Sequence, residues 1–261
     1  MNTAVAERAA WRGAPVLLLA IVLAWSLAIG AELTGSVQWV HHHRLMVDGV
    51  SPWFSLALFL LAWQIHIAAM MLPTALPMIG LFRQVAGVQR HPGLARAGFL
   101  GGYLVVWTLF GLAALVGDAL LDSMIQRWHW LMHRPEWVAG PILVMAGTFQ
   151  FSELKERCLD KCRQPRSFLI NHYRQGVSGA FSLGLRHGLF CLGCCWALMV
   201  VMFIVGIANL LWMAPLALLM LYEKVGRHGR RVARSSGAAL MLIGMLVIAD
   251  PAWMPNLLPA H

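Results

Sequence analysis

The sequence predicts an all-α polytopic membrane protein, a bundle of about seven transmembrane helices in one domain over residues 1–261. Hydrophobic residues make up 59% of the chain, charged residues only 12%, and the mean hydropathy is +0.68. An ordinary soluble domain carries about twice that share of charge. Apolar runs of about 20 residues are long enough to cross a bilayer as helices. A soluble or disordered chain therefore does not fit this composition.

The apolar runs give the expected spans in order. We expect them at about 15–33, 53–82, 97–117, 137–152, 187–207, 209–222 and 236–250. The stretch 189–222 would be about 51 Å long as a single helix, which exceeds the bilayer core. Gly206 and Asn209 offer a turn that divides it into two spans. The first run, which follows Arg8 and Arg12, also fits a signal peptide, and its cleavage would leave the other spans unchanged.

The basic residues predict the orientation, because cytoplasmic loops carry the excess of Lys and Arg. With the N-terminus inside, the C-terminus outside and seven spans, only Arg44, Arg127 and Arg134 of the 20 Lys and Arg residues fall outside. A single span over 189–222 would move the last basic loop to the wrong side. The net charge of +9 is thus explained by membrane topology. We expect the lipid bilayer as a partner and no nucleic acid.

The run from His187 to Cys195 (HGLFCLGCC) is the strongest candidate site. On a helix its spacing places one imidazole and three sulfurs on one face; these belong to His187, Cys191, Cys194 and Cys195. The run CLDKC adds Cys158 and Cys162 just past the preceding span. Thiolates and imidazole suit zinc or copper(I). Buried cysteines can be simple packing residues, but the clustering of all five favours metal or redox chemistry.

A second candidate lies within the second expected span. His66 is costly to bury without a partner, and Met70 faces the same side one turn later. Pro73 and Pro77 remove backbone donors just beyond them, and the freed carbonyls could bend the helix. The expected partners of His66 are a metal shared with the fifth span, a freed carbonyl, or the side chain of Gln150. Plain packing of the histidine and the methionine is the alternative.

The remaining polar features predict no catalytic site. The run of His41, His42 and His43 reads as a solvated turn, although a metal-collecting loop is conceivable. His129 and His133 have the same two readings at the outer interface. The sequence contains no phosphate loop of a nucleotide-driven pump, no covalent haem motif and no hydrolase constellation. Its carboxylates fall at span edges, so a proton-relay transporter lacks its usual parts.

At these motifs the chain resembles a bacterial family of predicted metal-binding integral membrane proteins, a domain of unknown function. The resemblance rests on residues 68–77, 102–107, 146–165, 184–199 and 209–213, and on Glu223 and Lys224. It implies a multi-span protein with a soft-metal site at Cys158, Cys162, His187, Cys191, Cys194 and Cys195. His66 stands where the family pattern would have methionine.

Three hypotheses follow. The first is a multi-pass protein of the bacterial inner membrane that binds a thiophilic metal, copper(I) ahead of zinc, at a cytoplasm-facing site for handling or delivery. Its expected partners are the metal ion and another membrane or metal-handling protein. The second makes the cysteines a membrane thiol-disulfide relay, and the third a zinc staple in an accessory subunit of a membrane complex. The first and third hypotheses describe no enzyme.

Overall fold

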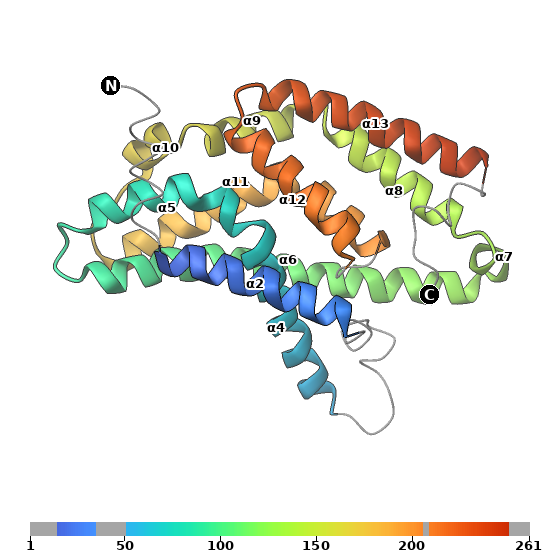
Figure 1. The fold of residues 1–261 in the computed structure, drawn as a ribbon, viewed down its shortest axis with the longest axis horizontal. Coiled ribbons are helices and arrows are strands. Elements are labelled where there is room, and N and C mark those ends of the chain that lie inside the picture. Colours follow the sequence, from blue (N-terminus) through green and yellow to red (C-terminus); the bar gives the residue numbers. More distant parts are fainter. Residues whose placement is uncertain (1–14, 35–50, 206–208, 251–261) are drawn as a thin grey trace. The chain divides into compact units, whose positions relative to one another are not determined.

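The computed structural model describes residues 15–34, 51–205 and 209–250, and within these ranges every regular element is a helix (Figure 1). The helices are α2 (Pro15–Leu33), α4 (Pro52–Met70), α5 (Leu72–Ala86), α6 (Pro92–Arg127), α7 (His129–Met132), α8 (Glu136–Phe149), α9 (Glu153–Arg163), α10 (Pro165–His172), α11 (Gly176–Val205), α12 (Leu210–Val225) and α13 (Gly229–Ala249). The predicted all-α fold class is confirmed.

The chain divides into two compact units. Unit 1 comprises residues 1–111 and 157–193, and unit 2 comprises residues 112–156 and 194–261. Both α6 and α11 contribute their first part to unit 1 and their last part to unit 2. The candidate residues are therefore distributed over both units.

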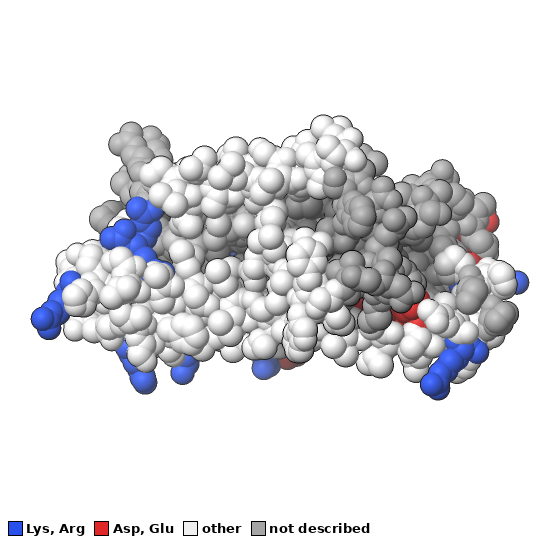
Figure 2. Space-filling model, turned by 90° about the horizontal axis from the view of Figure 1, so that it is seen from below, with Lys and Arg blue, Asp and Glu red and all other residues white. Residues whose placement is uncertain are grey.

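Five of the described helices are long and apolar enough to cross a membrane: α2, α4, α6, α11 and α13. The predicted fourth and sixth spans correspond to α8 and α12, which have 14 and 16 residues. A helix of 14 residues is about 21 Å long, shorter than the hydrocarbon core. Uncharged residues form most of the face in Figure 2, and large apolar side chains on α2, α6 and α13 are exposed. The number of spans stays a prediction.

Two helices extend beyond the predicted spans. The third span was expected at 97–117, but α6 continues to Arg127 because no proline or glycine interrupts residues 118–127. The fifth was expected from His187, but α11 begins at Gly176, whose φ of +87° favours glycine. The stretch 189–222 does form two helices, since α11 ends at Val205 and α12 begins at Leu210. Gly206, the expected turn, lies outside the described residues.

The predicted second span, 53–82, is divided at Met71 into α4 and α5. Proline lacks an N–H, so Pro73 leaves the carbonyl of Ala69 without its helical donor. The indole Nε1 of Trp25 in α2 donates to that oxygen at 3.1 Å. The hydroxyl of Thr74 donates to the carbonyl of Met71 at 2.8 Å. Pro73 thus lies at the interruption between α4 and α5, whereas Pro77 lies within α5. The Trp25 indole satisfies the carbonyl that Pro73 frees.

In unit 1, glycines bring α6 and α11 into backbone contact. A Cβ atom on Gly102 would collide with the carbonyl oxygen of Phe181, and one on Gly184 with that of Phe99. Only a residue without a side chain permits so close an approach. The crossing fixes the neighbouring Tyr103 of α6 against the histidine-cysteine turn of α11.

In unit 2, α8 and α13 pack antiparallel along most of α8 (Figure 1). A Cβ atom on Gly147 would lie 2.6 Å from the carbonyl oxygen of Gly237, and one on Gly244 would lie 2.7 Å from that of Gly140. α12 packs against α13 as well. The end of α8 that leads into α9 therefore lies beside the first half of α13.

Candidate metal centre

The histidine and three of the cysteines lie on α11, as predicted. His187 and Cys191 are one turn apart in the unit 1 part of the helix, and Cys194 and Cys195 are in the unit 2 part. All four side chains are buried. The helix therefore presents soft donors to the protein interior in both units.

Three aromatic rings surround the imidazole of His187. Its ring centroid lies 6.0 Å from that of Phe99, 5.8 Å from Tyr103 and 5.8 Å from Phe168. The first two rings come from α6 and the third from α10, so two neighbouring helices hold the imidazole in one orientation. A ligand positioned in this way loses little conformational freedom when it binds a metal.

The thiol of Cys191 contacts a tyrosine hydroxyl. The Tyr103 Oη atom lies 3.2 Å from Cys191 Sγ, and it lies 3.4 Å from the carbonyl oxygen of Met71. Cys191 is buried, so the hydroxyl contacts it in the protein interior. Tyr103 thereby connects the interruption between α4 and α5 to the candidate centre, a connection that the sequence analysis missed.

Cys158 of α9 packs against α11. A Cβ atom on Gly193 would lie 2.6 Å from Cys158 Sγ, so the sulfur rests directly on the helix backbone two residues after Cys191. Cys158 is buried, whereas Cys162, one turn further along α9, is half-buried. Cys158 of α9 therefore lies against α11 in unit 1, and Cys162 lies nearer to solvent.

His66 is buried, and its Nε2 atom makes no hydrogen bond within the described residues. Its ring stacks on that of Trp63, with centroids 5.7 Å apart. Met70 on the same helix is fully buried. Of the expected partners, the carbonyl freed by Pro73 accepts from Trp25 instead, and the amide of Gln150 makes no hydrogen bond to a described residue.

Unit 2 contains a group of buried charges that sequence reasoning missed. Lys155 Nζ of α9 lies 2.6 Å from Glu223 Oε2 of α12, with 2% and 1% of the side chains exposed. Lys224 is also buried, and the hydroxyl of Ser236 donates to Glu223 Oε1 at 3.4 Å. Burial raises the pKa of the Glu223 carboxyl, while Lys155, Lys224 and Ser236 oppose that shift. The signal for these buried charges in the sequence was the adjacent pair Glu223 and Lys224, which directly follows an apolar run.

The described residues contain no group of three or more His, Cys, Asp or Glu side chains arranged to hold a metal ion. Donors occur singly or in close pairs, such as Cys194 and Cys195, whose Sγ atoms are 3.5 Å apart. Structural zinc requires four ligands. The donors are thiols and imidazoles, which are ligands that copper(I) and zinc both accept.

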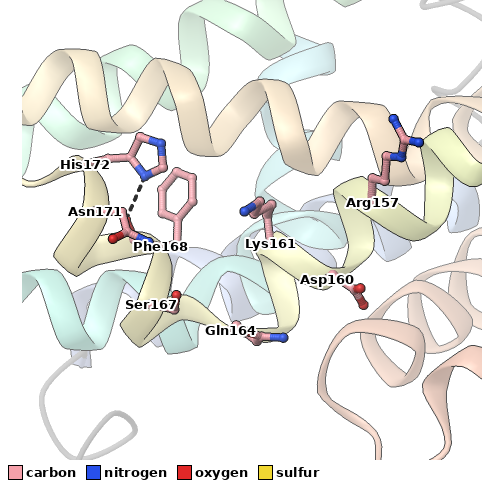
Figure 3. Close-up of a pocket in the computed structure, with 8 residues that line it drawn as sticks. All are labelled: Arg157, Asp160, Lys161, Gln164, Ser167, Phe168, Asn171 and His172. Atoms are coloured by element: carbon pink, nitrogen blue, oxygen red, sulfur yellow. Dashed lines mark hydrogen bonds between the residues drawn. The ribbon is translucent and has the colours of Figure 1, made fainter.

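A pocket of about 280 Å³ lies in unit 1 (Figure 3). Residues of α9 and α10 line it, together with the connecting Gln164; the lining residues are Arg157, Asp160, Lys161, Gln164, Ser167, Phe168, Asn171 and His172. The His172 ring packs on Phe168, and its Nδ1 lies 2.9 Å from the carbonyl oxygen of Phe168. Phe168 is shared with the surroundings of His187, so this polar surface adjoins the candidate centre.

The structure adds no evidence on the other histidines that the sequence analysis considered. His41, His42 and His43 lie outside the described residues, as does the side chain of His129. His133 is exposed at the turn after α7.

Buried thiols and an enclosed imidazole on one helix are side chains of the kind that can bind soft metals. The profile of the PpoB2 family, described as copper chaperones, matches residues 60–247, and the chain belongs to this family. This result confirms the metal-related family expected from the sequence and supports copper; it gives no support for zinc. The match covers every candidate ligand from His66 to Cys195. No curated protein and no solved structure matches the chain.

Proposed function

We propose that this protein is a multi-span protein of the bacterial inner membrane that binds copper(I) through its buried cysteine and histidine side chains and delivers it to a recipient protein. The observation that carries the proposal is the pair His187 and Cys191, one turn apart on α11, buried and held by Tyr103. Membership of a copper chaperone family supports copper as the cargo. Apolar helices with exposed apolar side chains support a bilayer location.

The proposed roles of the ligands follow from their burial. Cys162 is half-buried on α9, the helix that contributes Arg157, Asp160 and Lys161 to the pocket of Figure 3, so we assign it as the entry ligand. Cys158 rests on α11 next to the turn that carries Cys191 and His187, which form the inner ligands. A cargo site needs exchange between ligands, because a closed four-ligand shell would retain the ion.

His66 and Met70 form a softer site along the path. An imidazole nitrogen that is buried without a hydrogen bond is costly, and a metal ion would relieve that cost. The thioether of Met70, one turn away, is a soft ligand suited to copper(I). These two residues supply binding without a thiol, so copper held there exchanges readily.

The test uses the full chain, purified in detergent without oxygen and titrated with copper(I) against a chromophoric chelator. Cys191→Ser should weaken copper(I) binding by about tenfold or more, because a hard hydroxyl replaces a soft ligand. Met78→Leu, a buried change of similar volume in α5, is the matched control and should bind like the parent. A parent protein that binds no copper, or a Cys191→Ser variant that binds equally well, contradicts the proposal.

A further inference from the structure

One end of unit 1 carries positive charge with little negative charge to balance it. The described residues of this unit contain nine Lys and Arg residues, and their carboxylates are Glu32 of α2 and Asp160 of α9. No Asp or Glu occurs at residues 82–117 or 161–222. Arg90 between α5 and α6 and Arg174 between α10 and α11 are exposed. The end of the surface that holds the loop between α5 and α6 accordingly shows Lys and Arg atoms without Asp or Glu atoms (Figure 2).

Side-chain contacts join the two loops that hold these arginines. Gln89 Nε2 donates to Tyr173 Oη at 2.9 Å, and the backbone N–H of Gly176 donates to Gln89 Oε1 at 3.2 Å. The next residue, Val177, packs on α6, because a Cβ atom on Gly98 would lie 3.2 Å from Val177 Cγ1. The loops and the helix starts beside them therefore form one continuous surface.

Apolar side chains project from the same surface. The exposed fractions are 88% for Val88, 79% for Ile170, 59% for Leu94 and 43% for Val177. Scattered apolar residues are common on protein surfaces, but a group of them rimmed by charged side chains marks an interaction site. The cationic docking surface is defined by these six residues: Val88, Arg90, Leu94, Ile170, Arg174 and Val177.

The cationic docking surface lies beyond the helical segments that are expected within the bilayer. α11 begins at Gly176, whereas its expected span begins at His187, so the extension is about 16 Å long. The headgroup region on each side of the hydrocarbon core is only about 5–8 Å thick. An extension of this length carries the start of α11 past the headgroups into water. A soluble partner therefore fits this surface better than the bilayer does.

The docking surface also lies close to the candidate metal centre along α10. The ring of Phe168 packs on the imidazole of His187, with centroids 5.8 Å apart. Ile170, two residues later on the same helix, is exposed. A partner that contacts Ile170 thus contacts the short helix that positions a proposed copper ligand.

We propose that the cationic docking surface binds an acidic soluble protein to which this chain passes copper(I). This inference rests on the proposed function, namely that the protein binds copper(I) and delivers it. The apolar side chains form the centre of the contact, and Arg90 and Arg174 attract the carboxylates of the partner. In the transfer, Cu–S bonds to the partner form as bonds to the sulfur and nitrogen ligands of this chain break. The partner's thiol protons pass to the released ligands or to water, and copper stays monovalent.

The test follows copper(I) transfer from the loaded full chain, in detergent and without oxygen, to a metal-free synthetic peptide. The peptide contains a pair of cysteines, leucine residues and a fluorescent label whose emission reports copper(I) binding. One version is flanked by glutamates and the other by lysines. At low salt the glutamate peptide should receive copper(I) about tenfold faster, and raising the ionic strength from about 20 to about 300 mM should remove most of this difference.

Substitutions locate the effect on the surface. Arg90→Glu combined with Arg174→Glu should abolish the preference for the glutamate peptide and leave the equilibrium affinity for copper(I) unchanged. Arg227→Glu combined with Arg231→Glu is the matched control, because these exposed arginines lie where α12 meets α13 in unit 2 and the change in net charge is the same. The control should keep the preference. Ile170→Ser should slow transfer to the glutamate peptide about threefold, because apolar contact with the leucines is lost.

Nanodiscs distinguish a protein partner from the bilayer. The slower transfer to the glutamate peptide in the variant of Arg90 and Arg174 should persist in nanodiscs of neutral lipid and in nanodiscs that contain anionic lipid. Its loss in either would show that lipid covers the surface, which overturns the inference. A parent that binds no copper(I) contradicts the proposed function itself. A parent that binds copper(I) without preferring the glutamate peptide, or a control variant that loses the preference equally, overturns only this inference.

Discussion

At residue 66 an imidazole stacks on Trp63, and its Nε2 atom is buried without a hydrogen bond to any residue that the structure describes. A polar atom in this state lowers the stability of the metal-free fold by roughly 1–3 kcal/mol. A cost of this kind is retained where the group has a function. If His66 is a ligand, its replacement by an apolar residue should stabilise the metal-free protein and weaken copper binding. If it is a packing residue, the same replacement should lower stability and leave copper binding unchanged.

His66→Leu should raise the midpoint of thermal unfolding of the copper-free protein, since an unpaired polar group is replaced by an apolar side chain. The same variant should bind copper(I) about tenfold more weakly. Met70→Leu keeps the volume and should weaken copper(I) binding with little change in stability. Thermal melts in detergent and chelator competition measure the two effects. A His66→Leu protein that is less stable and binds copper like the parent would mark a satisfied packing residue.

Lys155 and Glu223 show what sequence alone could not reveal at this scale. The partners are 68 positions apart, and each reads as an ordinary charge at the edge of a span. Only the packing of α9 against α12 turns them into a buried pair. The histidine and cysteine residues were recognisable because their spacing alone places them on one helix, whereas pairing between distant helices leaves no local signal.

Lys155→Met should destabilise the protein by about 3–5 kcal/mol, because the carboxylate of Glu223 remains buried without its closest cation. The double variant Lys155→Met with Glu223→Met should recover much of this loss, since no uncompensated charge remains. Chemical or thermal unfolding of the metal-free proteins gives the comparison. Equal destabilisation of the single and double variants would show that the pair is not the cause.

Among the elements, α2 and α6 mark the limits of sequence prediction. The first apolar run predicted 15–33, and α2 spans Pro15–Leu33, because apolar residues and a starting proline define both ends. For α6, hydropathy located the membrane segment but not the ten further helical residues to Arg127. The contact of α6 with α11 was also unpredictable, because a glycine shows its role only when the opposite backbone is known.

Gly102 and Gly117 of α6 provide a matched test of that contact. A Cβ atom on Gly102 would collide with Phe181 O and lie 2.8 Å from Leu185 N, whereas one on Gly117 meets nothing within 4 Å. Gly117→Ala should be neutral or stabilise the helix by up to about 1 kcal/mol. Gly102→Ala should lower thermal stability and, by displacing Tyr103, weaken copper(I) binding. Indistinguishable melts for the two variants would exclude backbone contact between α6 and α11.

For the whole molecule, the path through the bilayer is decided by α8. If only α2, α4, α6, α11 and α13 cross, the basic segment after α8 lies outside. If α8 and α12 cross as well, that segment lies inside, as its lysines and arginines predict. Packing within unit 2 favours the second path. α8 lies antiparallel on the middle of α13 through Gly147 and Gly237, so both helices share one depth.

Charge contacts at the end of this helix pair support the same path. Arg230 Nε at the start of α13 lies 3.7 Å from Glu156 Oε1 of α9, so the beginnings of α9 and α13 lie close together. On the proposed seven-span path both would lie on the cytoplasmic side. Reporter fusions after Arg96, Arg174 and Arg234 should therefore all report cytoplasm. The fusion after Arg174 is decisive, because the five-span path places it in the periplasm and the seven-span path does not. A periplasmic signal there would require α8 to leave α13 on insertion and would place the entry cysteine, Cys162, on the opposite side from the one proposed.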